Sequence, residues 1–410
     1  MAAPLEDIRV VEVANWLAAP AAAALLRDLG ADVIKVEPPG GDVFRGFPLR
    51  SLGYEHDFDL NYAFEVDNRG KRSISIALDR PGGPELVHRL CAGADVFVTN
   101  LTPPRRERYA LGEERLLELN PRLVYASLSG YGTRGPDAER PGFDYAAFWA
   151  RSGLMSVLGE PPSPPPLCRG GQGDHTAALN LLAAVLAALR LRDRSGEGQY
   201  VEVTLQGTGM WTLAADLSVA LAVREQPARH DRQAPANPIW NSYRTRDGRW
   251  LLLVMPQPDP YWPGFCRALE WEAWIDDARY ASAAGRSERT RELTTSIQER
   301  FETRTLAEWA VRLDAERLIW APVAELPEVV ADVQPRETGA ITRVTHPEHG
   351  SFETLDTPFE LRGSDVSARG PAPGPGQHTR QILEELGVTP GEVADLQASG
   401  ALPRALPESG

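Results

Sequence analysis

The 410-residue sequence has only three cysteines, at positions 91, 168 and 266. Their wide spacing fits neither a disulfide framework nor a cysteine-held metal site, so we expect no metal centre and a reducing compartment. No apolar run is long enough to span a membrane, because Asn180 and Arg190 interrupt the stretch Ala177–Leu191. The first residues also lack the basic region and apolar core of a secretion signal. These features predict a cytoplasmic protein that does not contact a membrane.

Positive charge is also scarce, with 43 Lys and Arg against 57 Asp and Glu and a formal net charge of −14. This balance argues against a nucleic-acid partner, which requires a basic surface. The motifs His-Glu-x-x-His, Gly-x-Ser-x-Gly and Gly-x-x-x-x-Gly-Lys are missing, which disfavours metal hydrolysis, serine hydrolysis and P-loop chemistry. Residues Gly130–Gly135 spell Gly-x-Gly-x-x-Gly, but Pro136 and a polar stretch follow where a dinucleotide site requires a helix. We therefore expect a flexible loop there.

Alternating strand and helix patterns fill the first half of the sequence. They predict an α/β fold with a Rossmann-like, open, mostly parallel sheet covered by helices on both faces. Gly30 is expected just beyond the end of the first helix. The predicted strands are Ile8–Val13, Ala31–Glu37, Ser73–Leu78, Ala94–Thr99, Leu123–Ser129 and Tyr200–Leu205. The predicted helices are Ala18–Leu29, Pro81–Cys91, Glu113–Leu119 and a long apolar helix from His175.

The length and a change of sequence texture after Val223 predict two domains. Residues 1–222 form the N-terminal part of a large α/β domain, and residues 223–236 form a linker. Residues 237–325 form a smaller α/β domain. Residues 326–410 comprise a second linker and a C-terminal segment that returns to the large domain.

Two groups of basic residues and one aspartate stand at predicted loop positions. Arg69, Lys71 and Arg72 precede the third strand, and a second group follows the fourth; together they could form a phosphate pocket or be solvated loop charges. The second group is Arg105, Arg106 and Arg108. Asp174 ends a glycine-rich loop and could either cap the following helix or present a nucleophilic carboxylate. The residues alone leave both alternatives open.

Several stretches together resemble the family III CoA-transferases, the group that includes formyl-CoA transferase and carnitine CoA-transferase. The resemblance covers nearly the whole chain. It is carried by "VVEVANWLAAPAAAALLRDLGADVIKVEPPGGD", "NRGKRSISIALDRPGG", "NLTPPRRERYALGEERLLELNPRLVYASLSGYGTRGP", "GGQGDHTAAL" and "GPGQHTRQILEELG". It implies an acyl-CoA:carboxylate CoA-transferase that uses coenzyme A as substrate with no permanently bound cofactor, and two chains interlocked as a homodimer.

Asp174 falls on the catalytic aspartate of that family. The resemblance implies that its carboxylate attacks an acyl-CoA to give a mixed anhydride and then an aspartyl-CoA thioester. It also implies contacts to coenzyme A at twelve other positions. These are Trp16, Leu17, Ala18, Ile76, Ala77, Leu78, Asn100, Leu101, Thr102, Arg108, Phe143 and Asp144.

The chain departs from the family pattern at two basic positions, which are Pro38 and Thr102 here; Arg45 and Arg69 are the candidates to replace the lost contacts. Phe143 stands where the related α-methylacyl-CoA racemases have a histidine, so a racemase or isomerase is the weaker alternative. A second alternative is a non-catalytic CoA-binding subunit. A group of aromatic residues favours a larger, less polar acceptor acid than oxalate. The group is Trp16, Phe148, Trp149 and Trp240.

Overall fold

The computed structural model describes residues 2–407, which divide into two compact units. Within the described residues, unit 1 comprises residues 2–156, 167–224 and 333–407, and unit 2 comprises residues 157–166 and 225–332. This division differs from the predicted ranges in several places. Of the predicted linker 223–236, residues 223–224 group with unit 1 and residues 225–236 with unit 2. Residues 157–166 group with unit 2 although the prediction includes them in the large domain, and residues 326–332 group with unit 2 although the prediction makes them linker.

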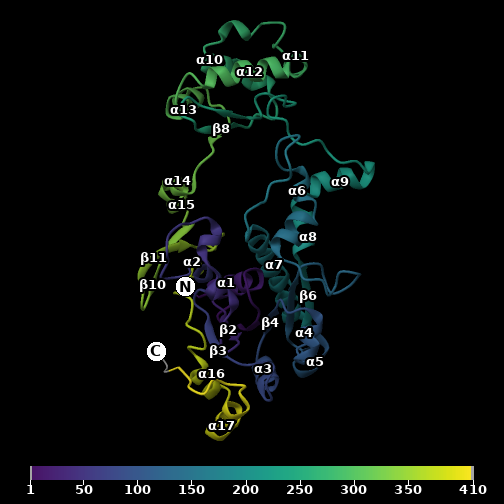
Figure 1. The fold of residues 1–410 in the computed structure, drawn as a ribbon, viewed down its shortest axis with the longest axis vertical. Helices are drawn as coiled ribbons and strands as arrows, with labels where there is room; N and C mark the ends of the chain where they lie inside the picture. The colour runs from purple at the N-terminus through teal and green to yellow at the C-terminus, as the bar shows by residue number, and fades with distance from the viewer. Residues whose placement is uncertain (1, 408–410) are drawn as a thin grey trace. The chain divides into compact units, whose positions relative to one another are not determined.

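The core of unit 1 is a parallel six-stranded sheet with the order β3-β2-β1-β4-β5-β6 (Figure 1). Its strands are β1 (Arg9–Val13), β2 (Asp32–Glu37), β3 (Arg72–Ser75), β4 (Val96–Thr99), β5 (Val124–Ser129) and β6 (Gln199–Thr204). The predicted α/β class and open parallel sheet are confirmed. The third strand ends earlier than predicted because the amide of Ala77 donates to the carbonyl of Ala401, in the C-terminal segment, at 2.8 Å.

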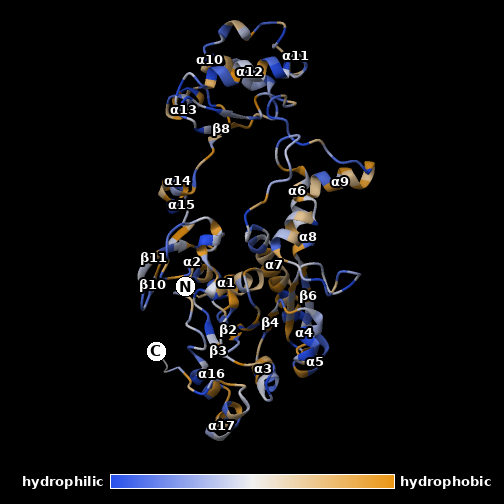
Figure 2. Cartoon of the chain, viewed as in Figure 1, coloured by the Kyte–Doolittle hydropathy of each residue, from blue (hydrophilic) through white to orange (hydrophobic). Residues whose placement is uncertain are grey.

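Alternate residues of the strands enter two separate hydrophobic cores, as the period of two requires. Val10 of β1 belongs to the core that contains α1 (Ala18–Asp28) and α7 (Gln172–Ser195). Val11 belongs to the core on the other face, with α3 (Gly83–Ala92), α5 (Glu113–Leu119) and α16 (Thr379–Glu385). The apolar character of α1 and α7, which pack together, is visible in Figure 2.

Helix α7 is long and apolar enough to cross a membrane by length and composition alone. In the fold, however, Ala177, Leu181 and Val185 are buried in the core shared with α1. The expectation that no apolar run is long enough is therefore wrong by length and composition, and 39% of the most apolar 18-residue stretch of α7 is buried. The predicted glycine at the end of α1 is confirmed, since Gly30 follows the C-cap residue Leu29 with φ of 107°.

Shorter helices connect the strands of unit 1, and a hairpin lies in its C-terminal part. The helices are α2 (Tyr62–Asn68), α4 (Pro103–Arg108), α6 (Leu154–Val157), α8 (Leu205–Thr212), α9 (Ala214–Val223), α15 (Val333–Glu337) and α17 (Pro390–Ser399), with the π-helix η3 (Tyr145–Ala150) and the 3-10 turns η1 (Val43–Gly46) and η2 (Leu49–Leu52). The hairpin is β10 (Ile341–His346) and β11 (Gly350–Leu355). As predicted, a loop without a helix follows Gly130–Gly135, and its base is closed where Gly130 and Gly142 meet backbone to backbone.

Unit 2 has a three-stranded antiparallel sheet of β7 (Ser242–Arg244), β8 (Trp250–Leu253) and β9 (Trp320–Pro322). Its helices are α10 (Trp262–Ala268), α11 (Ala283–Glu288), α12 (Thr290–Phe301), α13 (Leu306–Ala315) and α14 (Leu326–Ala331), with the turns η4 (Asp259–Tyr261) and η5 (Glu272–Trp274). Buried aromatic side chains, among them Trp262, Phe301 and Trp309, fill its separate core.

Candidate active site

The candidate site lies at the carboxyl end of the sheet, where the strand order reverses between β1 and β4. Ligands of open parallel sheets bind at such a position. The loops after these two strands are joined by a reciprocal pair of hydrogen bonds. The amide of Asn15 donates to Asn100 Oδ1 at 3.1 Å, and Asn100 Nδ2 donates to the Asn15 carbonyl at 2.6 Å. Asn100, one of the predicted coenzyme A contacts, therefore holds the first loop in place.

The first loop is held in an uncommon backbone conformation. Trp16 has φ of 67°, a region that few side-chain-bearing residues adopt. Its amide donates to Asp42 Oδ1 at 3.2 Å, and its ring makes an edge contact with Phe143 at 5.5 Å between centroids. Leu17 follows as the N-cap residue of α1 and lies near Gly171. The structure thus brings the predicted residues Trp16, Leu17 and Phe143 together.

Buried ion pairs hold the first loop, which contains Trp16, in place through Asp42. Lys35 Nζ lies 2.7 Å from Glu12 Oε1 and 2.9 Å from Asp42 Oδ2, with all three side chains fully buried. Burial opposes the charge on Lys35, but the carboxylates around it outweigh this effect and raise its pKa. Since Asp42 also accepts the Trp16 amide, the buried pairs fix the position of the first loop.

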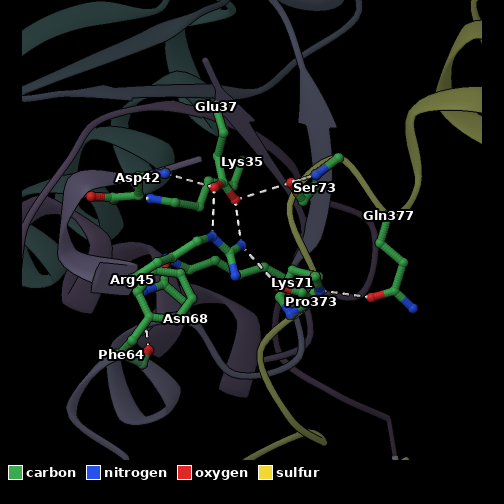
Figure 3. Close-up of polar contacts among 12 residues, drawn as sticks. Lys35, Glu37, Asp42, Arg45, Phe64, Asn68, Lys71, Ser73, Pro373 and Gln377 are labelled. Atoms are coloured by element: carbon green, nitrogen blue, oxygen red, sulfur yellow. Dashed lines mark hydrogen bonds and ion pairs between the residues drawn. The ribbon is translucent and has the colours of Figure 1, made fainter. Parts of the chain in front are cut away.

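Figure 3 shows the adjoining contacts of Arg45 and Glu37. Arg45 donates to both oxygens of Glu37, at 2.8 and 2.6 Å, and to the carbonyl of Pro373 at 2.8 Å. Arg69 is buried and paired with Asp28. The prediction that Arg45 or Arg69 replaces the basic contacts missing at Pro38 and Thr102 is therefore wrong, because each guanidinium is already neutralised by a carboxylate.

The first basic group does not form a phosphate pocket either. Arg72 pairs with Asp32 and Glu385, and the fully buried Lys71 pairs with Glu12 at 2.7 Å. In the second group, Arg106 is buried and donates to the Leu101 carbonyl at 2.6 Å. Arg105 and Arg108 are exposed, so they are the members of the two groups whose positions suit an external phosphate.

Asp174 does not cap the helix, so that alternative is wrong. Helix α7 begins at Gln172, its N-cap residue is Gly171 with φ of 87°, and Asp174 is the third helical residue. Gly173 is required before it because a Cβ there would lie 2.3 Å from Cγ of Phe148. The glycines bring the start of α7 against the buried Phe148 and place the Asp174 carboxylate where the helix dipole favours an anion.

The Asp174 carboxyl group has an unusual environment for an aspartate. Its residue is buried with 9% of its surface exposed. Burial, together with the nearby negative charge of Asp144, raises its pKa to about 7, although the neighbouring His175 opposes the rise. A carboxyl group with this pKa changes charge near neutral pH, as groups at functional sites often do.

Asp144 lies beside it at the start of η3 and is also buried. Neither of its carboxylate oxygens makes a hydrogen bond of normal geometry within residues 2–407. Burial raises its pKa, while the amides of Gly171 and Gly173 and the charge of His175 lower it. Asp144 was expected as a coenzyme A contact; its unsatisfied oxygens face the glycine loop that carries Asp174.

His175 directly follows Asp174, and the sequence places it only at the start of the long apolar helix. Its Nε2 lies 2.9 Å from Oδ1 of Asp67, which is buried on α2. Burial lowers the pKa of His175, but the hydrogen bond and charge of Asp67 outweigh it and raise the pKa to about 9. The only signal in the sequence was adjacency to Asp174, because Asp67 lies 108 positions away.

The remaining predicted contacts are distributed along the same end of the sheet. Ala18, Ile76, Ala77 and Leu101 are buried, and Leu78 packs partly buried against the core below β3. Thr102 is the N-cap residue of α4. A cleft of about 930 Å³ lies nearby between α4, α5 and β6, but none of the Asp174 loop lines it. Its lining has five glutamates, at positions 107, 113, 114, 139 and 202, against three arginines, at positions 106, 115 and 134, so acidic side chains predominate.

The predicted aromatic acceptor pocket is wrong in part. Phe148 and Trp149 are 4% and 8% exposed and belong to the hydrophobic core, where Phe148 supports the start of α7. Trp240 lies in unit 2 and is exposed. Trp16 is the member of this group that lies at the site, in contact with Phe143, whose own side chain is exposed. Among residues 2–407, no cluster of three or more His, Cys, Asp or Glu residues could hold a metal ion.

Comparisons with known proteins agree on one family. Residues 5–379 match the model of CoA-transferase family III. The chain is 31% identical to a (R)-2-hydroxy-4-methylpentanoate CoA-transferase of Clostridioides difficile, over 93% of this chain and 95% of that protein. It is 33% identical to a succinate–glutarate CoA-transferase of Agrobacterium fabrum, over 93% of this chain and 96% of that protein. A CAIB/BAIF family protein from Brucella suis has a similar structure, with a TM-score of 0.84, 29% identity, and coverage of 94% of this chain and all of that one.

Proposed function

Because the chain belongs to CoA-transferase family III, we propose that it moves coenzyme A from an acyl-CoA donor to a carboxylic acid acceptor, with Asp174 as the nucleophile. The observation that carries this proposal is the position of Asp174. Its carboxylate is buried in the first turn of α7, beside glycines that allow close approach to the backbone, at the carboxyl end of a parallel sheet.

The proposed cycle needs no oxidant or reductant. An oxygen of ionised Asp174 attacks the thioester carbonyl carbon, the C–S bond breaks, and coenzyme A leaves as its thiolate. The thiolate then attacks the Asp174 acyl carbon of the mixed anhydride, which releases the donor carboxylate and leaves an aspartyl-CoA thioester. The acceptor carboxylate attacks this thioester, and the released thiolate then attacks the acceptor acyl carbon. The product is a new acyl-CoA, and Asp174 returns as a carboxylate.

Backbone amides support the developing negative charge in this proposal. The first amides of an α-helix have no acceptor within the helix; that of Gln172 opens α7, while that of Gly173 is directed at Asp144. Such preorganised donors stabilise an oxyanion without needing to reorient during the reaction. Since Asp174 is shielded from solvent, these interactions act in a less polar medium than water, which strengthens them.

Coenzyme A is proposed to lie along the carboxyl ends of β1, β3 and β4. The exposed Arg108 is the proposed phosphate contact, and Asn100 and Thr102 lie in the loop before its helix. The first-loop residues Trp16, Leu17 and Ala18 and the loop residues Phe143 and Asp144 are proposed to surround the thioester. The backbone at Ile76, Ala77 and Leu78 is the proposed nucleotide contact, since two of these side chains are buried.

A racemase or isomerase on this scaffold is the second candidate, and the paired carboxyl groups of Asp144 and Asp174 are the observation in its favour. Against it, the residue at the histidine position is Phe143, which cannot carry a proton. A non-catalytic CoA-binding subunit would need no carboxylate of raised pKa. The acceptor acid is proposed to be larger and less polar than oxalate, because Trp16 and Phe143 provide an apolar face beside Asp174.

The proposal is tested by intact-protein mass spectrometry after incubation with acyl-CoA donors and trapping with hydroxylamine or borohydride. We expect an adduct on the wild type and none on Asp174→Ala. The matched control is Asp193→Ala, which removes an exposed aspartate from the far end of the same helix and should leave the adduct unchanged. An adduct on Asp174→Ala, or coenzyme A binding without any adduct on the wild type, would contradict the proposed nucleophile.

A further inference from the structure

His175 is the accessible cation next to the proposed nucleophile. Its side chain is 50% exposed, whereas that of its partner Asp67 is 2% exposed. One ring nitrogen, Nε2, lies 2.9 Å from Asp67 Oδ1, and the other, Nδ1, faces the backbone of Gly171, whose carbonyl also favours the charged ring. Gly171 is also near Leu17 of the first loop, so the ring borders the space between the first loop and the start of α7.

Arg169 of the glycine loop is also exposed, and it donates to the Leu52 carbonyl at 2.5 Å, whereas two other basic side chains near the loop pair with carboxylates. Lys71 is completely buried against Glu12, and Arg45 donates to both oxygens of Glu37. The charged groups that act on His175 are carboxylates from three elements. Asp67 comes from α2, Asp174 from α7 itself, and Asp144 from the start of η3. One imidazolium, that of His175, therefore interacts electrostatically with three carboxyl groups.

The charge balance of this group changes during the proposed cycle. While Asp174 is an anion, the positive charge of His175 is partly satisfied by it. Once Asp174 is acylated, its negative charge is lost, and His175 remains with Asp67 and the buried Asp144. The molecules that must leave and enter at that moment are both carboxylates, the donor acid and the acceptor acid.

We propose that His175, held by Asp67, binds the carboxylate group of the acid substrates during the stage in which Asp174 is covalently occupied. The proposal rests on the proposed function, because it requires an Asp174 intermediate. His175 is then a binding residue for a monoanionic carboxylate head, independent of the remainder of the acid. The exposed half of the ring supplies access, and Asp67 keeps the ring charged and oriented.

The test uses exchange of a labelled acid with its own CoA ester, which needs no knowledge of the natural acceptor. Succinyl-CoA, 4-methylpentanoyl-CoA and 3-phenylpropanoyl-CoA are first screened for an adduct on the wild type. The ¹³C-labelled acid of the reactive donor is then exchanged into that donor. We expect His175→Gln to raise KM for the labelled acid about 10- to 100-fold, as for the loss of a charge-assisted hydrogen bond. KM for the acyl-CoA should change less than about threefold.

The pH profile separates binding from a structural role. In the wild type, KM for the acid should stay level through neutral pH and rise above about pH 9, where His175 loses its proton. Asp67→Asn keeps the His175 ring but removes the carboxylate that stabilises its positive charge. The rise in KM for the acid should therefore occur at a lower pH. His175→Lys should restore much of the affinity, and Thr176→Ala, on the same helical turn, should leave it unchanged.

Each outcome has one meaning. If the adduct forms in the wild type and in His175→Gln, but KM for the acid and its pH profile are unchanged, the role of His175 is overturned while Asp174 keeps its own. If no donor forms an adduct on the wild type, the proposed function and this inference both fall. If His175→Gln does not fold, an unchanged pH profile in Asp67→Asn overturns the inference in its place.

Discussion

At the scale of single residues, the ionised form of Asp174, which is the form that reacts, should lower the free energy of unfolding near and above neutral pH. Its pKa rises from an ordinary value of 3.8 to about 7 on folding, so the folded state holds an extra proton between these values. The stability that this proton provides is present below about pH 4 and is lost as the pH rises through 7. Asp174→Asn, which resembles the protonated form, should therefore match the wild type near pH 4 and be more stable at pH 8. The difference at pH 8 should be on the order of 1–4 kcal/mol.

Urea denaturation at several pH values measures this difference. Asp193→Asn is the control, because it removes an exposed carboxylate from the same helix. If Asp174→Asn and the wild type are equally stable at both pH 4 and pH 8, the pKa of the Asp174 carboxyl group is not raised in the folded protein.

At the scale of elements, the start of α7 depends on a glycine at the second helical position. Gly173→Ala would place Cβ 2.3 Å from Phe148 Cγ, so the first turn must shift away from the core. We expect a loss of about 1–3 kcal/mol in stability from overpacking and a larger proportional loss of adduct formation, because Asp174 moves with the turn. Gly391→Ala is the matched control. It lies at the second position of α17 with open space around it, and it should be neutral or stabilising by up to about 1 kcal/mol.

The double variant Gly173→Ala/Phe148→Leu gives an independent check on this cause. The smaller side chain makes room for the new methyl group, so thermal stability and adduct formation should both recover in part. If the double variant is no better than Gly173→Ala, crowding against Phe148 is not what positions the helix start.

The helices and strands also show which features of the fold could be predicted from the sequence and which could not. The alternation of strand and helix depends on local patterns, so it predicted the parallel sheet and the end of α1 at Gly30. Ion pairing between distant segments has no local pattern. The sequence left Arg69 and Arg72 as either phosphate ligands or solvated charges, whereas the fold pairs them with Asp28 and Asp32, and Asp67 becomes a partner of His175 only through the packing of α2. Likewise, the exact start of α7 follows from packing on Phe148 and corrected the interpretation of Asp174 as a cap.

At the scale of the whole molecule, an uncovered apolar surface on α8 and α9 supports the proposal of a homodimer. Trp211 and Leu221 are 75% and 65% exposed, and Met210, Val219 and Val223 are also exposed. Contiguous apolar surface of this kind usually marks an interface.

We expect sedimentation to give twice the mass of the chain for the wild type. After refolding from denaturant, which lets interlocked chains separate, the double variant Trp211→Glu/Leu221→Glu should give the mass of one chain at micromolar concentration, since charge at an apolar interface is strongly unfavourable. Val311→Glu, at an exposed position on α13, should leave the mass unchanged. If the double variant sediments like the wild type, the α8–α9 surface is not the contact that holds two chains together.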